Sequence, residues 1–173
     1  MKSFRVALSL LAAGAAIFCV PPSAQAQTAL YGMYGGASSG VVNTGNLYGP
    51  TFGAYFDRGT FINGGIDIRG TFLSDGNLTQ FDSGMAGLRL AVKPHIIPFD
   101  PYGELLVGGA HANYGQGSAK TTKNSLGYEA VVGADFTILP HIDWRVLEFS
   151  YSNLTGGGIS PKALSTGIVV RLF

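Results

Sequence analysis

The amino-acid sequence predicts an all-β protein, an eight-stranded antiparallel up-and-down barrel that crosses a membrane, and three observations support this fold class. Apolar and polar residues alternate along eight segments, which is the period of a β-strand. Isolated charges lie within these segments, as Asp67 and Arg69 do in FINGGIDIRGTF. Only 12% of the residues are charged, about half the usual share. One face of each strand is therefore polar, but its charges are too sparse for a surface that contacts water. We expect the apolar face to contact lipid and the polar face to form a charged core.

The N-terminal residues have the pattern of a secretory signal. Lys2 and Arg5 precede an apolar stretch at residues 6–20, and the motif Ala-Gln-Ala occupies residues 24–26. The apolar stretch is too short for a comfortable transmembrane helix, whereas the three features together are typical of a cleaved signal peptide. The sequence therefore predicts a signal peptide at residues 1–26 and one barrel domain at residues 27–173.

Eight strands are predicted in the remaining chain, each about ten to thirteen residues long, and a tilted membrane strand needs ~9–11. Their ranges are 30–40, 47–56, 61–72, 83–92, 102–114, 126–138, 144–154 and 164–173. The first consists mostly of Gly, Tyr and Ala, so its register stays open. The second contains Pro50, which removes a ladder hydrogen bond and is expected at the barrel rim.

The next three strands have clearer faces. Alternation in the third strand turns Ile66 and Ile68 toward lipid and Asp67 and Arg69 inward. The fourth strand places Leu88 and Leu90 outward and Arg89 inward. The fifth carries Glu104 but is less regular, because His111 shares the outward phase of Leu105 and Val107.

The last three strands repeat this pattern. The sixth turns Leu126 and Tyr128 outward and Glu129 and Asp135 inward. The seventh places Leu147 and Phe149 outward and Glu148 inward. Leu164, Ile168 and Val170 form the outward set of the eighth strand.

Connections between the predicted strands are of two kinds. Three are short or proline-rich: the tight turn at residues 57–60, PHIIPFDP at 94–101 and LPHID at 139–143. Four are rich in Gly, Ser, Thr, Asn and Lys. An even-stranded barrel with both termini in the periplasm has three periplasmic turns and four outer loops, so the sequence predicts this orientation.

Several segments carry a family resemblance: PYGELLVGGA, GYEAVVGADF, DWRVLEFSYSNL and the final LSTGIVVRLF, which ends on the aromatic Phe173. Together they resemble the small porin-like outer-membrane barrels that include OmpX and the membrane domain of OmpA. The resemblance implies a cell outer-membrane location, contact with lipid and lipopolysaccharide, and insertion by the barrel-assembly machinery through the C-terminal strand. In this family the residue two positions before the terminal aromatic is usually apolar and faces outward, whereas here it is Arg171. Either Leu172 therefore belongs to the lipid-facing set, or Arg171 snorkels to the interface.

Inward charges are the main candidate site. They are Asp67, Arg69, Arg89, Glu104, Glu129, Asp135 and Glu148. We expect a salt-bridged network that fills the lumen, because eight strands enclose a barrel just wide enough for side chains; the alternative is a small gated pore. Carboxylates outnumber arginines in this set, so some must rely on water, hydroxyls, Arg171 or protonation.

Two further groups of residues are predicted at the membrane surfaces. Tyr102, Trp144 and Phe173 are expected in the periplasmic aromatic girdle. Lys120, Lys123 and Lys162 lie in outer loops, either as lipopolysaccharide contacts or as ordinary solvated lysines.

Catalysis is not expected. Ser150-Tyr151-Ser152-Asn153 resembles the motif of the outer-membrane lipid A deacylases, but that family has a His where Ser150 stands. Ser152 without an adjacent base is a weak nucleophile. His95 and His141 lack metal-binding partners, so no cofactor is predicted, and the net charge of +1 gives no nucleic-acid surface.

The predicted function is therefore a monomeric outer-membrane barrel with a structural or interaction role. The alternatives are a small ion-conducting channel, a lipid A-modifying hydrolase, and a soluble lipocalin-like barrel with apolar residues inside.

Overall fold

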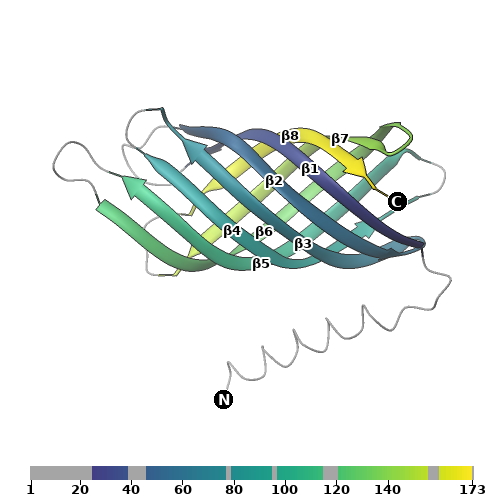
Figure 1. Ribbon diagram of the computed structural model, residues 1–173, viewed down its shortest axis with the longest axis horizontal. Helices are drawn as coiled ribbons and strands as arrows, with labels where there is room; N and C mark the ends of the chain where they lie inside the picture. Colours follow the sequence, from purple (N-terminus) through teal and green to yellow (C-terminus); the bar gives the residue numbers. More distant parts are fainter. Residues whose placement is uncertain are drawn as a thin grey trace, which may run out of the picture.

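The structure is a closed antiparallel barrel of eight strands, each paired with its neighbours in the chain (Figure 1). The computed structural model describes residues 25–38, 46–76, 79–94, 97–114, 121–155 and 160–172. Pairing of β1 with β8, from Ala29 opposite Arg171 to Ser38 opposite Lys162, closes the sheet on itself. Closure leaves no unpaired sheet edge, which is the requirement for strands in lipid. The predicted fold class is confirmed.

All eight predicted strands are present, and the structure extends most of them. The bounds are β1 Gln25–Ser38, β2 Asn46–Gly59, β3 Ile62–Ser74, β4 Gln80–Val92, β5 Phe99–Tyr114, β6 Thr121–Leu139, β7 Ile142–Leu154 and β8 Lys162–Arg171. Six of the seven predicted connections were too long, and two residues show why. Asp57 is in β2 rather than in a turn, because it pairs with both Gln27 and Gly65, and Thr121 begins β6 by pairing with Tyr114. No helix in the described ranges is long and apolar enough to cross a membrane.

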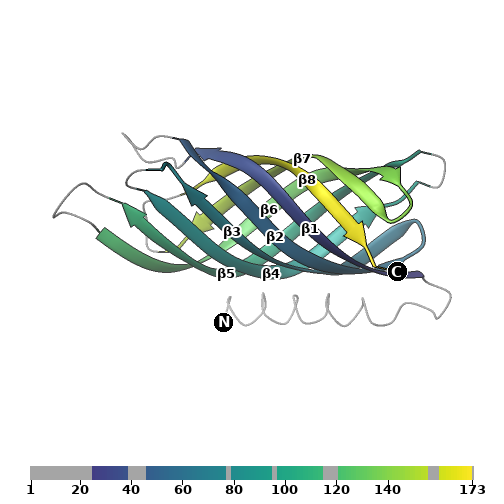
Figure 2. The ribbon, with the colours of Figure 1, turned by 45° about the horizontal axis from the view of Figure 1, so that its top comes forward.

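The two ends of the barrel differ in their connections. We call the end where β1 begins and β8 finishes the terminal mouth; its connections span residues 60–61, 93–98 and 140–141. At the opposite end, the loop mouth, the connections span 39–45, 75–79, 115–120 and 155–161. The C-terminal end marks the terminal mouth in Figures 1 and 2, and β5 and β6 project furthest at the loop mouth. The predicted division into three turns and four loops is confirmed.

The outer wall is apolar over its whole circumference. Large side chains on all eight strands are exposed, with Ile62 65% exposed, Leu105 65% and Leu126 72%. A soluble monomer rarely exposes so much contiguous apolar surface, whereas a membrane barrel must. Leu172 belongs to this outward set and Arg171 turns inward to pair with Asp143 at 2.9 Å, so the first of the two readings of the C-terminal strand holds.

The lumen contains two layers of different chemistry, which corrects the expectation of a charged core throughout. Charged side chains fill the part nearer the terminal mouth. A buried apolar cluster extends to the loop mouth, and we call its six members nearest that end the apolar plug: Ala37, Leu47, Leu73, Phe81, Ala112 and Leu154. The inward face of β3 shows both layers, because Asp67 and Arg69 are followed by Leu73 at 5% exposure. Inward position therefore does not imply a polar residue.

Candidate functional site

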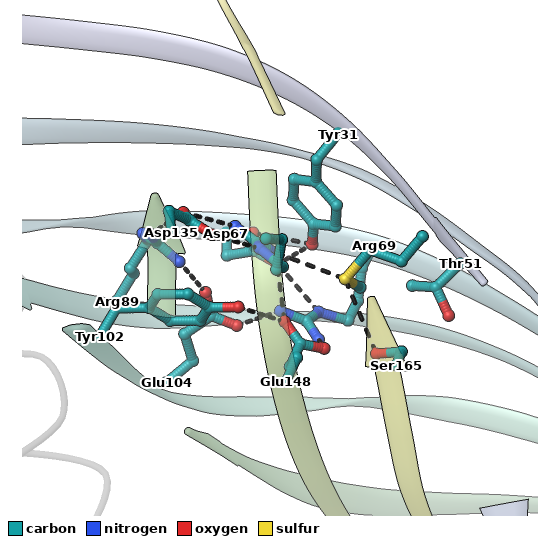
Figure 3. A network of polar contacts seen from close by, with 12 residues as sticks. Tyr31, Thr51, Asp67, Arg69, Arg89, Tyr102, Glu104, Asp135, Glu148 and Ser165 are labelled. Carbon is teal, nitrogen blue, oxygen red and sulfur yellow. Dashed lines mark hydrogen bonds and ion pairs between the residues drawn. The ribbon is translucent and has the colours of Figure 1, made fainter. Parts of the chain in front are cut away.

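Three arginines are buried together in the lumen. Arg69 of β3, Arg89 of β4 and Arg145 of β7 are 3%, 1% and 0% exposed. A buried guanidinium is costly unless carboxylates and hydrogen bonds surround it. The closed sheet supplies these partners from strands that are far apart in sequence (Figure 3).

Arg69 contacts three carboxylates. Its Nε donates to Asp67 Oδ1 at 3.1 Å and its Nη1 to Glu148 Oε1 at 2.8 Å, while Nη2 contacts Glu104 Oε2. Asp67 lies two residues away on the same face of β3, whereas Glu104 and Glu148 come from β5 and β7. One guanidinium thus connects three strands.

Arg89 makes a similar set of contacts. Its Nη1 contacts Glu104 Oε1, its Nε donates to Asp57 Oδ2 at 3.2 Å, and its Nη2 donates to Asp135 Oδ2 at 3.3 Å. Glu104 therefore uses its two oxygens for two different arginines. Figure 3 shows Glu104 lying between Arg89 and Arg69.

Arg145 completes a closed ring. It donates to Asp135 Oδ1 at 2.8 Å through Nε and to Glu148 Oε2 at 3.1 Å through Nη1. Arginines and carboxylates consequently alternate around one cycle of ion pairs, which we call the charge ring: Arg69, Glu104, Arg89, Asp135, Arg145 and Glu148. The ring is formally neutral, because three guanidiniums face three carboxylates. Charge-assisted bonds of this kind are roughly twice as strong as neutral ones.

Tyrosines support the ring through both their hydroxyls and their faces. The Tyr31 hydroxyl donates to Asp67 at 2.9 Å, and the Tyr102 hydroxyl donates to Glu148 Oε2 at 2.6 Å. The Arg89 guanidinium lies 3.8 Å from the ring centroid of Tyr102 and 4.2 Å from that of Tyr55. A guanidinium stacks favourably on an aromatic face, so these rings cover the apolar surfaces of the ions.

Tyr102 is therefore not a girdle residue, and that prediction was wrong. The side chain is only 5% exposed and lies in the lumen. It shares the inward phase of Glu104 on β5, two residues away, so strand alternation already contradicted a lipid-facing position.

Arg145 was missing from the predicted set because β7 contains a bulge. Asp135 pairs with Arg145 and Ala134 with Leu147, so Val146 is an extra residue in β7. The same irregularity appears toward β8, where Arg145 pairs with Gly167 and Glu148 with Ser165. A bulge changes which phase of the strand points inward. Both Arg145 and Glu148 can therefore face the lumen although they are three residues apart.

Two predicted lumenal charges lie outside the ring: Asp67, which pairs with Arg69, and Glu129, which makes no ion pair with the described residues. Glu129 is 5% exposed, and its hydrogen-bonding neighbour is the Ser150 hydroxyl. A small cavity of about 20 Å³ lies beside it, lined also by Arg69, Glu148 and Thr51. That volume is close to the requirement of one water with several polar partners. The Ser150 hydroxyl thus supplies a hydrogen bond to the Glu129 carboxylate, which has no arginine partner in the described part of the chain.

The surface predictions have mixed outcomes. Trp144 is 44% exposed on the outer wall, with Nε1 donating to Thr166 Oγ1 at 3.0 Å. Lys162 is exposed at the loop mouth, but it is the first residue of β8, and Lys123 lies within β6, so neither is in a loop as predicted. Phe173 and Lys120 lie outside the described residues, as does His95, and the Lys123 side chain is not described. Lipopolysaccharide contact by the three lysines stays a prediction.

The serine motif contains no serine–histidine pair in the described part of the chain. Ser152 is 5% exposed, faces the lumen and pairs with Glu129 in the ladder. His111 Nδ1 lies 2.6 Å from Asn124 Oδ1 on the outward face of the barrel. The two side chains are thus on opposite faces of the sheet. The described residues contain no group of three or more His, Cys, Asp or Glu side chains that could hold a metal ion.

A closed barrel with an apolar exterior and a filled, ion-paired lumen is the architecture of a small membrane-spanning β-barrel. The chain belongs to the outer membrane protein beta-barrel domain family, whose model matches residues 10–171. It is an integral protein of the outer membrane. None of the curated protein sequences matches the chain.

Solved structures of the same fold are distant in sequence. Neisserial surface protein A is 16% identical, with a TM-score of 0.61 over 86% of this chain and 98% of that one. The attachment invasion locus protein Ail of Yersinia pestis is 12% identical, with a TM-score of 0.57 over 85% and 97%. The outer membrane enzyme PagL is 14% identical, with a TM-score of 0.51 over 82% and 98%. Likeness at this level shows the fold alone.

Proposed function

We propose that the protein is a non-conducting outer-membrane barrel with a structural or interaction role and no catalytic activity. The charge ring is the observation that carries this proposal. It links β3, β4, β5, β6 and β7 across the lumen, and the apolar plug fills the lumen again toward the loop mouth. A permeant ion would have to pass both layers. Side chains that fill the lumen of an eight-stranded barrel support rigidity rather than transport.

Conductance in planar bilayers tests this proposal. We expect the purified protein to give no steady single-channel steps. Arg89→Ala opens space in the ring and leaves Asp57, Glu104 and Asp135 without one guanidinium, so it is the variant with which to look for leakage. Lys162→Ala, exposed at the loop mouth, is the matched control. Discrete steps in the unmodified protein, with ion selectivity that changes in Arg89→Ala, would establish the small-channel alternative instead.

We also propose that the terminal mouth faces the periplasm and that the loop mouth faces the exterior. Two of the three connections at the terminal mouth are only two residues long, which supports this orientation because periplasmic turns are short in such barrels. Thr155 and Thr60 are exposed at opposite mouths and give a direct test, because the only cysteine is Cys19 in the predicted signal. A bulky impermeant maleimide should label Thr155→Cys on intact cells and Thr60→Cys only after permeabilisation. The reverse pattern would overturn the orientation.

The loop mouth is the surface we propose for envelope contacts. Lys162, together with Lys120 and Lys123 before β7, would offer ammonium groups to lipopolysaccharide phosphates. We take the protein to be a monomer inserted by the barrel-assembly machinery through its C-terminal strand. Deleting Phe173 should lower the amount of protein in the outer membrane, which fractionation measures; an unchanged amount would remove the role of that residue.

A further inference from the structure

The terminal mouth contains a cavity that the charge ring does not explain. Its volume is about 460 Å³, within the range of small-molecule sites. Polar and charged residues lie in its wall: Asn63 at the start of β3, Lys93 after β4, Asp100 in β5, His141 in the β6–β7 turn and Arg171 at the end of β8. Residues from opposite sides of the barrel therefore face one space.

Lys93 and Asp100 face this cavity with opposite charges but without an ion pair. Among the described residues, no carboxylate lies within 4.0 Å of the Lys93 ammonium, and no basic group lies that close to Asp100. Lys93 Nζ instead donates to the neutral Gln27 Oε1 of β1, across the mouth. Burial lowers the pKa of Lys93, partly offset by Asp57 and Asp100. This contrasts with the lumen below, where every arginine of the ring contacts at least two carboxylates.

Unsatisfied polar atoms gather at the same end of the barrel. Within the described ranges, the buried side-chain atoms without a hydrogen-bond partner are Asp57 Oδ1, Arg58 Nε, Asn63 Oδ1 and Arg171 Nε. All four belong to residues within the last or first few positions of strands at the terminal mouth. Two of the residues, Asn63 and Arg171, line the cavity, and Asn63 is 3% exposed. Buried polar groups are normally paired, so the polar groups at this end of the barrel are less completely satisfied than those of the charge ring.

His141 adds a strained backbone to this wall. It has a φ of 69°, a left-handed conformation that glycine or asparagine would adopt more readily. Its carbonyl accepts the Arg171 backbone N–H at 2.8 Å, so the turn holds Arg171 at the cavity. The two-residue connection between β6 and β7 accounts for this conformation of His141, since such hairpin turns use positive φ.

We propose that this cavity binds a small zwitterion, an amino acid or short peptide, with its carboxylate at Lys93 and its ammonium at Asp100. The separated, unpaired charges of opposite sign carry the inference. A simple anion would leave Asp100 repulsive, and a simple cation would leave Lys93 with only the neutral Gln27 amide as its partner. The carboxylate would displace the Gln27 amide, a weaker neutral acceptor. This binding role is independent of the proposed non-conducting role.

The test is a titration of the folded barrel in detergent micelles with alanyl-alanine, followed by backbone amide chemical shifts. Shifts should saturate and should map to residues 60–63, 93–94 and 140–141. Acetate and methylammonium, which each carry one half of the zwitterion, should bind at least about tenfold more weakly, the effect of one charge-assisted hydrogen bond.

Two variants separate the halves of the site. Lys93→Met and Asp100→Asn should each weaken dipeptide binding about tenfold or more, whereas Lys162→Met at the loop mouth should leave it unchanged. Heat-modifiable gel migration checks that each variant is folded. If one variant is not folded, the comparison of alanyl-alanine with acetate and methylammonium on the unmodified protein still tests the proposal. Absence of saturable binding, equal binding of acetate and dipeptide, or unchanged affinity in both variants would overturn the proposal.

Discussion

The two layers of the lumen block it by opposite means, and the contrast shows how each responds to change. The charge ring is held by directional contacts, because each guanidinium contacts two or three particular carboxylates. The apolar plug is held by the shape of side chains such as Leu47, Leu73 and Phe81. Loss of one ring member leaves charges buried without partners, whereas loss of one plug member leaves a void that neighbours can partly fill. The ring should therefore be the more fragile layer.

The largest effect is expected in the ring. Arg89→Ala leaves Asp57, Glu104 and Asp135 each short of one partner, and breaking a buried pair costs about 3–5 kcal/mol. Urea unfolding of the barrel in lipid vesicles should show that loss in the free energy of unfolding. A loss below that of the plug variant described next would contradict the contrast between the layers.

A plug variant should have a smaller effect. Leu47→Ala removes a side chain that is 1% exposed, and we expect a loss of about 2–3 kcal/mol in the free energy of unfolding, the lower part of the range for such truncations. The loop mouth is close, so neighbouring side chains and water can occupy part of the void. The same urea titration measures the change, and Leu105→Ala on the outer wall serves as its size-matched comparison.

Removing both partners of one ring contact sharpens the comparison. Arg145→Met combined with Asp135→Leu should cost less than Arg145→Met alone, because the double change leaves fewer buried charges without partners. A double-mutant cycle gives the coupling energy, expected at about 1–3 kcal/mol. Additive losses would show that the two residues act independently and that the ring is not one network.

A substitution that takes away the space occupied by Tyr102 should lower the free energy of unfolding still less. Gly133 lies where an added Cβ would meet the Tyr102 hydroxyl region and would be 3.0 Å from the Leu147 carbonyl oxygen. Gly133→Ala should displace the tyrosine from Glu148 at a cost of about 1–2 kcal/mol. Gly84→Ala, where nothing lies within 4 Å of the added carbon, is the matched control. Equal unfolding midpoints for the two variants would remove this role of Gly133.

The period-two pattern was sufficient for much of the lumen. It correctly assigned Asp67, Arg69, Arg89, Glu104 and Glu148 to the inner face, because alternation along a paired strand is a local property. It failed for Arg145, since the extra residue Val146 changes the phase of β7. Asp57 was also missed, because glycine and arginine beside it gave the sequence signal of a turn while ladder pairing extended β2 to Gly59.

The number of strands, the outward apolar surface and the division of connections between the two mouths can all be predicted from the amino-acid sequence. Each of these follows from local alternation and turn composition. Which charges contact one another, by contrast, depends on how the strands are assembled in three dimensions. Register and the β7 bulge bring Arg145 and Glu148 to the same face, and closure of the barrel sets β7 opposite β3 so that Glu148 reaches Arg69. The predicted excess of carboxylates thereby becomes a neutral six-membered ring with additional acids around it, because contacts across a lumen depend on closure rather than on any one strand.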